Sequence, residues 1–273
     1  MIEVKEFKQV AVNAALKAGD VLNKNRGRVK KVDYKGKINI VTEIDLLSER
    51  TIITIIKKNF PDHSILTEES EEQKTDSIYR WIIDPLDGTT NYAHDFPSYC
   101  ISIALEKEGS IILGVVYNPL LDELFTTEIG KGAFLNKRRI RVSSTRRLSK
   151  SFLATGFPYD IRESKITNLD HFANFATRSL AIRRAGSAAL DLCYLAIGRF
   201  DGFWELKLSP WDTAAASLVV KEAGGKVTDA FGKPLDFSGG VKMEKNYGVV
   251  VTNGVLHDAV LKAIRPLPIE KKV

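Results

Sequence analysis

The feature that most constrains this chain is a buried strand that ends in an acidic residue and a proline. Residues 81–83 (Trp-Ile-Ile) are aromatic or β-branched, which predicts a strand buried on both faces. Asp84 follows at once, and Pro85 has no N–H with which to continue a sheet ladder. We therefore expect the strand to end here, with the Asp84 carboxylate at its carboxyl end.

A second carboxylate, Asp87, follows three residues later, and the small residues beside it predict the start of a short helix at positions 88–90. Two carboxylates at the end of a buried strand are costly unless a cation holds them. A hard divalent cation with oxygen ligands, most simply Mg²⁺, would do so, and the helix start would accept phosphate. The alternative is a β-turn in which Asp84 and Asp87 only cap the next helix.

Residues 84–91, with the sequence DPLDGTTN, resemble the signature of the inositol monophosphatase family. The resemblance implies a Mg²⁺-dependent, lithium-sensitive phosphomonoesterase related to fructose-1,6-bisphosphatase. Supporting segments extend from about Asn39 to Gly225, which is most of the chain. They favour the metal-binding interpretation of the two aspartates over the simple turn.

A helix is predicted from residue 39 to about residue 59, and its first residues resemble the family's second motif, N/D-x-V-T-x-x-D. The resemblance implies that Asp45 orients Thr89 and the attacking water. The residues alone suggest that Thr42 caps the helix and that Asp45 lies in its first turn, where the dipole favours an anion. Both roles can coexist. The expected buried face consists of Ile44, Leu47, Ile52, Ile55 and Ile56.

Two glutamates, Glu68 and Glu69, follow a strand predicted at residues 64–67. Paired glutamates in an acidic loop are usually just solvated charge. The match to a glutamate pair of the family implies that Glu68 is a metal ligand and that Glu69 helps to hold the waters of the metal.

Small residues at positions 185–189 (AGSAA) mark a predicted junction between a strand and a helix. Such residues permit either close approach of a ligand to backbone N–H groups or close helix packing. The resemblance implies the first, with Gly186, Ser187 and Ala188 contacting the substrate alcohol. It also implies that Glu205, at the end of another predicted strand, hydrogen-bonds substrate hydroxyl groups.

Asp212 lies at the start of a predicted helix that ends near Gly224, and a helix cap is its simplest interpretation. However, the sequence WDTAA followed by EAGG is similar to the other signature of the family. That similarity implies that Asp212 is a metal ligand.

The implied metal site consists of oxygen ligands only, which favours Mg²⁺ or Mn²⁺ over Zn²⁺. By resemblance, Glu68, Asp84 and the Leu86 carbonyl oxygen hold one ion. Asp84, Asp87 and Asp212 hold a second, and a third lies near Glu68.

The implied catalytic residues are Asp45, Glu68 and Thr89, which act on a water that attacks phosphorus directly, without a phosphoenzyme. The N–H groups of Gly88 and Thr89 would hold the phosphate. The complete set of implied substrate contacts is Asp87, Gly88, Thr89, Gly186, Ser187, Ala188, Glu205 and Asp212. The lysines at positions 35 and 37 are further candidate contacts to phosphate, or simply solvated charge on a turn.

The expected substrate is inositol 1-phosphate or a related polyol or sugar phosphate. The nucleotide-bisphosphate phosphatases of the superfamily have Lys-Glu where this chain has Thr90-Asn91, so a nucleotide substrate is disfavoured. The alternative is fructose 1,6-bisphosphate, alone or as a second activity. Its distal phosphate would need cations; the candidates are Arg183, Arg184 and Lys207, each of which could equally be solvated or paired with Glu163 or Asp191.

The net charge of +6 suits an anionic substrate, but no basic run is interleaved with aromatic residues as in a single-strand nucleic-acid platform. We therefore expect no specific nucleic-acid partner. A non-catalytic protein that touches RNA or the transcription machinery is the alternative from another class, and the intact carboxylate set argues against it. A homodimer is implied by the resemblance alone.

Residues 1–6 lack the apolar core of a signal peptide, and no uncharged apolar run is long enough to span a bilayer, so a cytoplasmic location without membrane contact is expected. Cys100 and Cys193 are expected to be buried free thiols.

The irregular alternation of helices and strands predicts an α+β fold, and the resemblance implies a layered αβαβα sandwich of the sugar phosphatase type. We expect an N-terminal lobe at residues 1–145, with most metal ligands, and a closely packed C-terminal lobe at residues 146–273, with Asp212.

Overall fold

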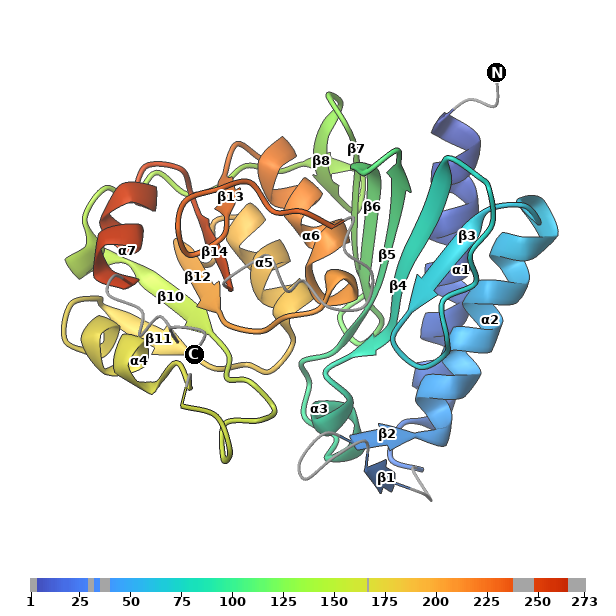
Figure 1. Ribbon diagram of the computed structural model, residues 1–273, viewed down its shortest axis with the longest axis horizontal. Helices are drawn as coiled ribbons and strands as arrows, with labels where there is room; N and C mark the ends of the chain where they lie inside the picture. The colour runs from blue at the N-terminus through green and yellow to red at the C-terminus, as the bar shows by residue number, and fades with distance from the viewer. Residues whose placement is uncertain (1–3, 29–31, 35–39, 166, 238–247, 265–273) are drawn as a thin grey trace, which may run out of the picture.

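The computed structural model describes residues 4–28, 32–34, 40–165, 167–237 and 248–264. Within these ranges, two large sheets alternate with pairs of helices, so that the elements form five layers (Figure 1). This arrangement confirms the predicted α+β fold with αβαβα layering. The lysines at positions 35 and 37 and Asn39 lie outside the described residues.

The first large sheet has the strand order β3-β4-β5-β6-β7-β8-β9. The β3–β4 pair is parallel, and the other pairs of this sheet form an antiparallel meander. Its strands are β3 (Ser64–Thr67), β4 (Tyr79–Asp87), β5 (Cys100–Lys107), β6 (Ser110–Asn118), β7 (Glu123–Glu128), β8 (Gly132–Leu135) and β9 (Arg138–Arg139).

Helices α1 (Val4–Asn25) and α2 (Glu43–Asn59) cover the outer face of this sheet (Figure 1). Their apolar residues recur at helical spacing and pack on alternate residues of the strands, such as Trp81 and Ile83. Next to α2, β1 (Val32–Tyr34) and β2 (Ile40–Thr42) form a small antiparallel pair.

The second large sheet has the order β11-β10-β12-β14-β13. Its strands are β10 (Phe152–Thr155), β11 (Ala181–Arg183), β12 (Gly202–Glu205), β13 (Lys226–Thr228) and β14 (Val249–Thr252). Helices α4 (Leu169–Ala176) and α7 (His257–Ile264) pack on its outer face around Phe175, Trp204 and Val260. Short helices α3 (Thr89–Ala93) and η1 (Leu148–Lys150) lie in connections.

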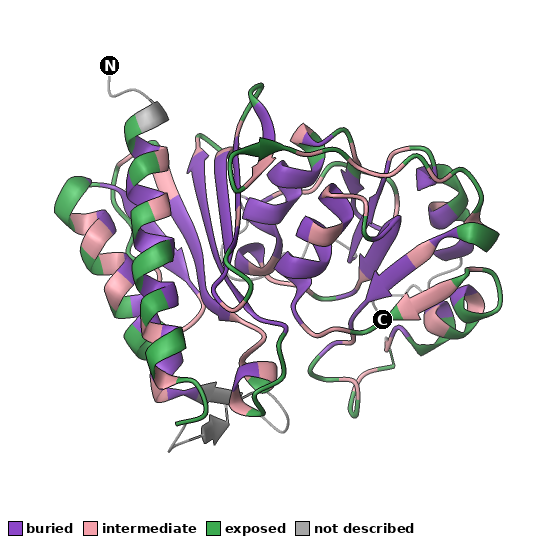
Figure 2. Ribbon diagram, turned by 180° about the vertical axis from the view of Figure 1, so that it is seen from behind, coloured by how far each residue is buried: buried purple, intermediate pink, exposed green. Residues whose placement is uncertain are grey.

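Helices α5 (Ala188–Ala196) and α6 (Pro210–Glu222) form the middle layer between the two sheets. They share one core with Val116 of the first sheet and Phe203 of the second. Figure 2 shows these helices mostly buried, whereas α1 and α2 are exposed along their outer side. Because α6 packs on β4, β5 and β6, the two predicted lobes are in close contact; the boundary at residue 145 stays a prediction.

Two predicted boundaries are wrong. Strand β4 does not end at Asp84 but continues to Asp87, and its pairing with β5 shifts register between these two residues. Pro85 lies inside the shift, where no ladder hydrogen bond is required of it. Helix α2 begins at Glu43 and not at residue 39, because Thr42 caps it and the preceding residues pair as β2.

Leu47 was expected in the buried face of α2 and is instead 43% exposed. The predicted thiols are confirmed, since Cys100 and Cys193 are free and buried. Among the described helices, none combines the length and apolarity needed to cross a membrane.

Candidate active site

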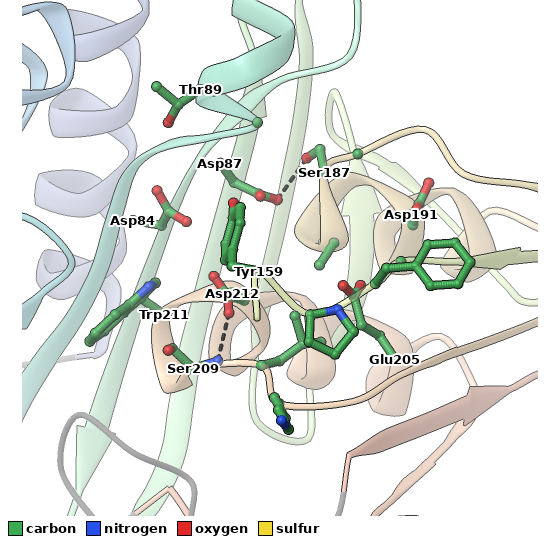
Figure 3. A pocket seen from close by; sticks show the side chains of 18 of the residues that line it. Asp84, Asp87, Thr89, Tyr159, Ser187, Asp191, Glu205, Ser209, Trp211 and Asp212 are labelled. Atoms are coloured by element: carbon green, nitrogen blue, oxygen red, sulfur yellow. Dashed lines mark hydrogen bonds between the residues drawn. The ribbon is translucent and has the colours of Figure 1, made fainter. Parts of the chain in front are cut away.

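One pocket lies where the carboxyl end of β4 meets the N-termini of α5 and α6 (Figure 3). It is lined by every predicted metal ligand and every predicted substrate contact. These residues are Glu68, Asp84, Leu86, Asp87, Gly88, Thr89, Gly186, Ser187, Ala188, Glu205 and Asp212. They come from segments far apart in the chain, and the αβαβα packing brings them together.

Asp84 and Asp87 are held in place by hydrogen bonds from both sides of the pocket. Asp84 is 1% exposed, and its Oδ1 accepts from the Leu86 N–H at 3.0 Å. The Asp87 Oδ2 accepts from the Ser187 Oγ at 2.7 Å and from the Ala189 N–H at 2.8 Å. The N-terminus of α5 therefore fixes the second carboxylate of the DPLD turn.

Asp212 occupies the third position of α6, where it forms a capping box with Ser209. Its Oδ2 accepts from the Ser209 N–H at 2.6 Å (Figure 3). Because Asp212 also lines the pocket, the cap and the predicted metal-ligand role are compatible.

The pocket carboxylates destabilise one another in the absence of a cation. Burial, followed by the charges of Glu68, Asp87 and Asp212, raises the pKa of Asp84 well above its usual value. Burial raises the pKa of Asp87 to about 6, although hydrogen bonds from Ser187 and Ala189 act against the shift. Burial, followed by the charges of Asp87 and Glu68, raises the pKa of Asp212 well above its usual value. Such a cluster is stabilised by a bound cation.

The donor set fits a hard divalent ion. Within the described ranges, no three His, Cys, Asp or Glu side chains are already gathered around one point as a closed metal cage. Mg²⁺ does not require such a cage, since it commonly binds one or two carboxylates and keeps waters or takes phosphate oxygens. The pocket lining contains no histidine or cysteine, which agrees with the prediction of Mg²⁺ or Mn²⁺.

Asp45 lies behind the pocket and contacts it through Thr89. The Thr89 Oγ is 2.8 Å from the Asp45 Oδ1 and 3.1 Å from the Leu86 carbonyl oxygen. The Asp45 Oδ2 accepts from the Thr42 N–H at 2.9 Å and from the Thr42 hydroxyl at 2.5 Å. Asp45 is completely buried, so the capping box of α2 gives it one fixed position. Its capping role and its contact with Thr89 coexist.

Position 88 requires a glycine. Its φ is +97°, and an added Cβ would lie 2.8 Å from the Ser98 carbonyl oxygen. A side chain here would displace the turn that connects Asp87 to Thr89.

Glu49 is a residue that the sequence analysis missed. It is 2% exposed on α2 and accepts from the Thr67 hydroxyl at 2.6 Å, the Glu69 N–H at 3.0 Å and the Ser70 hydroxyl. It therefore holds the turn that carries Glu68. The signal was present, because Glu49 follows Asp45 by four residues and precedes Ile52 by three, on the same helix face.

The three candidate cations for a distal phosphate lie in different surroundings. Arg184 and Lys207 line the pocket, but the Lys207 Nζ is bound to Asp160 at 2.6 Å and to the Ser164 hydroxyl at 2.7 Å. Arg183 is exposed, and its guanidinium lies over the Phe152 ring at 4.8 Å. It is not among the residues that line the pocket.

Tyr159 and Asp191 are among the pocket residues that were not predicted as site residues. The Tyr159 ring extends over the carboxylates at the pocket mouth, and the residue is 61% exposed (Figure 3). Nothing in the sequence around Pro158 indicates this position. Asp191 lies on α5, one turn after Ser187.

Comparisons with known proteins agree on one family. The profile described as "Inositol monophosphatase family" matches residues 3–268. The inositol-1-monophosphatase of Mesorhizobium japonicum is 44% identical over 94% of this chain and 95% of that protein. The Nus factor SuhB of Salmonella typhimurium is 43% identical over 94% of each chain. The solved inositol monophosphatase of Anabaena superposes with a TM-score of 0.86 at 42% identity, over 97% of both chains.

Proposed function

Because the chain belongs to the inositol monophosphatase family, we propose that it is a Mg²⁺-dependent phosphomonoesterase that hydrolyses inositol 1-phosphate or a related polyol or sugar phosphate. The observation that carries this proposal is the pocket itself. It brings Glu68, Asp84, Asp87 and Asp212 together, and burial, followed by the charges of the other three, raises the pKa of Asp84. A site that hydrolysed its substrate without a cation would not need such a charge cluster.

The carboxylates would hold two to three ions, as the family resemblance suggests. Glu68, Asp84 and the Leu86 carbonyl oxygen would hold one, and Asp84, Asp87 and Asp212 the other, with a third ion near Glu68. When bound, the ions would neutralise the phosphate charge and activate water for attack on phosphorus.

The residues of the chain would orient the reacting water. The Thr89 hydroxyl donates to Asp45, so its lone pairs remain available to accept a hydrogen bond from water. The proton of the water can then pass through Thr89 to the buried Asp45 carboxylate. The N–H groups of Gly88 and Thr89 would hold the phosphate.

A covalent phosphoenzyme is not part of the proposal. The nearest thiol is Cys100, whose Sγ lies 3.9 Å from the Asp87 Oδ2. Burial and the charge of Asp87 raise the pKa of Cys100 well above its usual value. It therefore stays a neutral thiol and a poor nucleophile. Direct attack by water is the simpler route.

The substrate alcohol would lie against Gly186, Ser187, Ala188 and Glu205. Gly156 makes room for Glu205, because a Cβ at this position would collide with the Glu205 carboxyl group. This close approach places the carboxyl group in the pocket wall, where it can bind hydroxyl groups of a polyol.

We expect inositol 1-phosphate to be hydrolysed with at least about a tenfold higher kcat/KM than fructose 1,6-bisphosphate. The reason is that Lys207 is already bound to Asp160 and Arg183 lies off the pocket, which leaves Arg184 as the remaining candidate cation of the three. Phosphate release from both substrates, measured with one preparation in Mg²⁺ and in chelator, tests this. Preference for the bisphosphate would reverse the assignment, and equal rates in chelator would remove the metal from it.

A second candidate function rests on the relatives named Nus factor SuhB. We propose a transcription-associated role as the alternative, with or without catalysis. Salt-sensitive binding to RNA or RNA polymerase by a protein that releases no phosphate would favour this role. The proposal also includes a cytoplasmic location, lithium sensitivity and a homodimer, each of which has its own measurement.

A further inference from the structure

Asp191 is a buried carboxyl group in the pocket that has no role in the proposed hydrolysis. It lies on α5, lines the pocket and is 2% exposed. Its Oδ1 is buried and has no hydrogen-bond partner among the residues that the structure describes. An unpaired buried carboxyl oxygen is costly, so its retention in a pocket wall points to a ligand that supplies the missing donor.

The neighbour of Asp191 in this wall is Glu205. Figure 3 shows both residues on the side of the pocket away from Asp84. Burial and the charges of Glu205 and Asp87 raise the pKa of Asp191 well above its usual value, against the opposing charge of Arg184. Burial raises the pKa of Glu205 to about 8, again opposed by Arg184. Two carboxyl groups and one cation therefore face this end of the pocket.

We propose that Asp191 and Glu205 form a paired acceptor for two hydroxyl groups of the substrate, which selects a polyol monophosphate and rejects a second phosphate. This inference rests on the proposed function and deepens it by naming the group that reads the far end of the substrate. Glu205 alone could bind one pair of adjacent hydroxyl groups. The two carboxyl groups together require hydroxyl groups over a wider part of the substrate's polyol ring.

The chemistry of the wall supports this selection. A hydroxyl group donates to the unpaired Asp191 oxygen and accepts from a carboxyl proton, so a neutral polyol satisfies both groups. A second phosphate would place further negative charge beside two acidic groups, with only Arg184 to offset it. Sites built around buried polar groups discriminate strongly against ligands that leave those groups unpaired.

The test is Asp191→Ala, with Ser217→Ala as the matched control. Ser217 is also buried, at 1% exposed, and its hydroxyl oxygen has no partner among the described residues, but it lies outside the pocket lining. We expect Asp191→Ala to weaken binding of myo-inositol, measured by calorimetry with Mg²⁺ and phosphate present, by about tenfold or more. The ratio of kcat/KM for inositol 1-phosphate to that for p-nitrophenyl phosphate should fall similarly. The control should change neither by more than about twofold.

A second variant, Asp191→Asn, keeps the shape of the side chain and removes its charge. It should raise kcat/KM for fructose 1,6-bisphosphate relative to inositol 1-phosphate by several fold. Asp191→Ala should not melt below the wild type, because it removes the unpaired buried oxygen. Asp191→Asn should not either, because it removes the repulsion from Glu205 and Asp87.

Three results would overturn the inference: unchanged myo-inositol binding in Asp191→Ala, a parallel loss on both monophosphates with a lower melting temperature, or wild-type protein that does not bind myo-inositol. The last two point to a structural role or to another ligand. If the wild type releases phosphate from no substrate, the proposed function fails, but the comparison of myo-inositol binding still decides the role of Asp191.

Discussion

Asp84→Asn is expected to lower the rate of phosphate release from inositol 1-phosphate by about a thousandfold or more. Asp84 is the proposed ligand shared by both ions, and metal ions contribute several kcal/mol of charge stabilisation to such transition states. Each 1.36 kcal/mol corresponds to a factor of ten in rate. The measurement is kcat/KM at saturating Mg²⁺, with the wild type assayed in parallel.

The same variant should remain folded, and in chelator it should melt at or above the temperature of the wild type. Asp84 is 1% exposed and is repelled by Glu68, Asp87 and Asp212, so removing its charge relieves strain in the metal-free protein. Asp20→Asn, an exposed change on α1, is a suitable control and should keep full activity. An active Asp84→Asn enzyme, or an inactive one that is unfolded, would count against the proposed role.

Thr89→Ala is expected to lower kcat by about 100- to 10,000-fold, the range typical of a lost proton-transfer group. The Thr89 hydroxyl is the link between the pocket and the buried Asp45 carboxylate, at 2.8 Å. Thr89→Ser keeps a hydroxyl group at the same position and should retain most of the activity. Single-turnover rates at saturating Mg²⁺ provide the measurement.

The variant Asp45→Asn and the double variant that combines it with Thr89→Ala complete this test. If the two residues act as one unit, the double variant should be about as slow as either single variant, and the effects should not multiply. Fully multiplicative effects, or a Thr89→Ala enzyme within a few fold of the wild type, would show that the pair does not transfer the proton.

The α+β class and helix α2 could be predicted because their signals are local, such as the apolar spacing of Ile44, Ile52 and Ile56. The five-layer arrangement and the site residues were implied by the resemblance of short segments to one family. The DPLDGTTN segment and the WDTAA helix start carry their chemistry in a few consecutive positions. Seven of their residues line the pocket, namely Asp84, Leu86, Asp87, Gly88, Thr89, Trp211 and Asp212. Their roles as metal ligands and substrate contacts stay predictions.

Other features could not be predicted because they depend on partners far away in sequence. The pairing of β4 beyond Pro85 depends on a register shift against β5, which neither strand encodes alone. Lys207 binds Asp160, a partner that was not predicted, since the turn after β10 brings that carboxylate near. Burial of Asp191 beside Glu205 depends on how α5 and β12 pack, and its sequence neighbours are simply apolar.

The central claim is that acidic groups distant in sequence form one pocket that requires divalent cations. The most direct test is the melting temperature of the wild-type protein, measured with about 10 mM Mg²⁺ and with chelator, at pH 8 and at pH 6. Because the folded-state pKa values of Asp84, Asp87 and Asp212 are raised, their ionised forms destabilise the metal-free protein at pH 8, and protons relieve this cost as the pH falls toward 6. We expect Mg²⁺ to raise the melting temperature by about 5 °C or more at pH 8 and by clearly less at pH 6. No increase at pH 8, or the same increase at both pH values, would contradict the account.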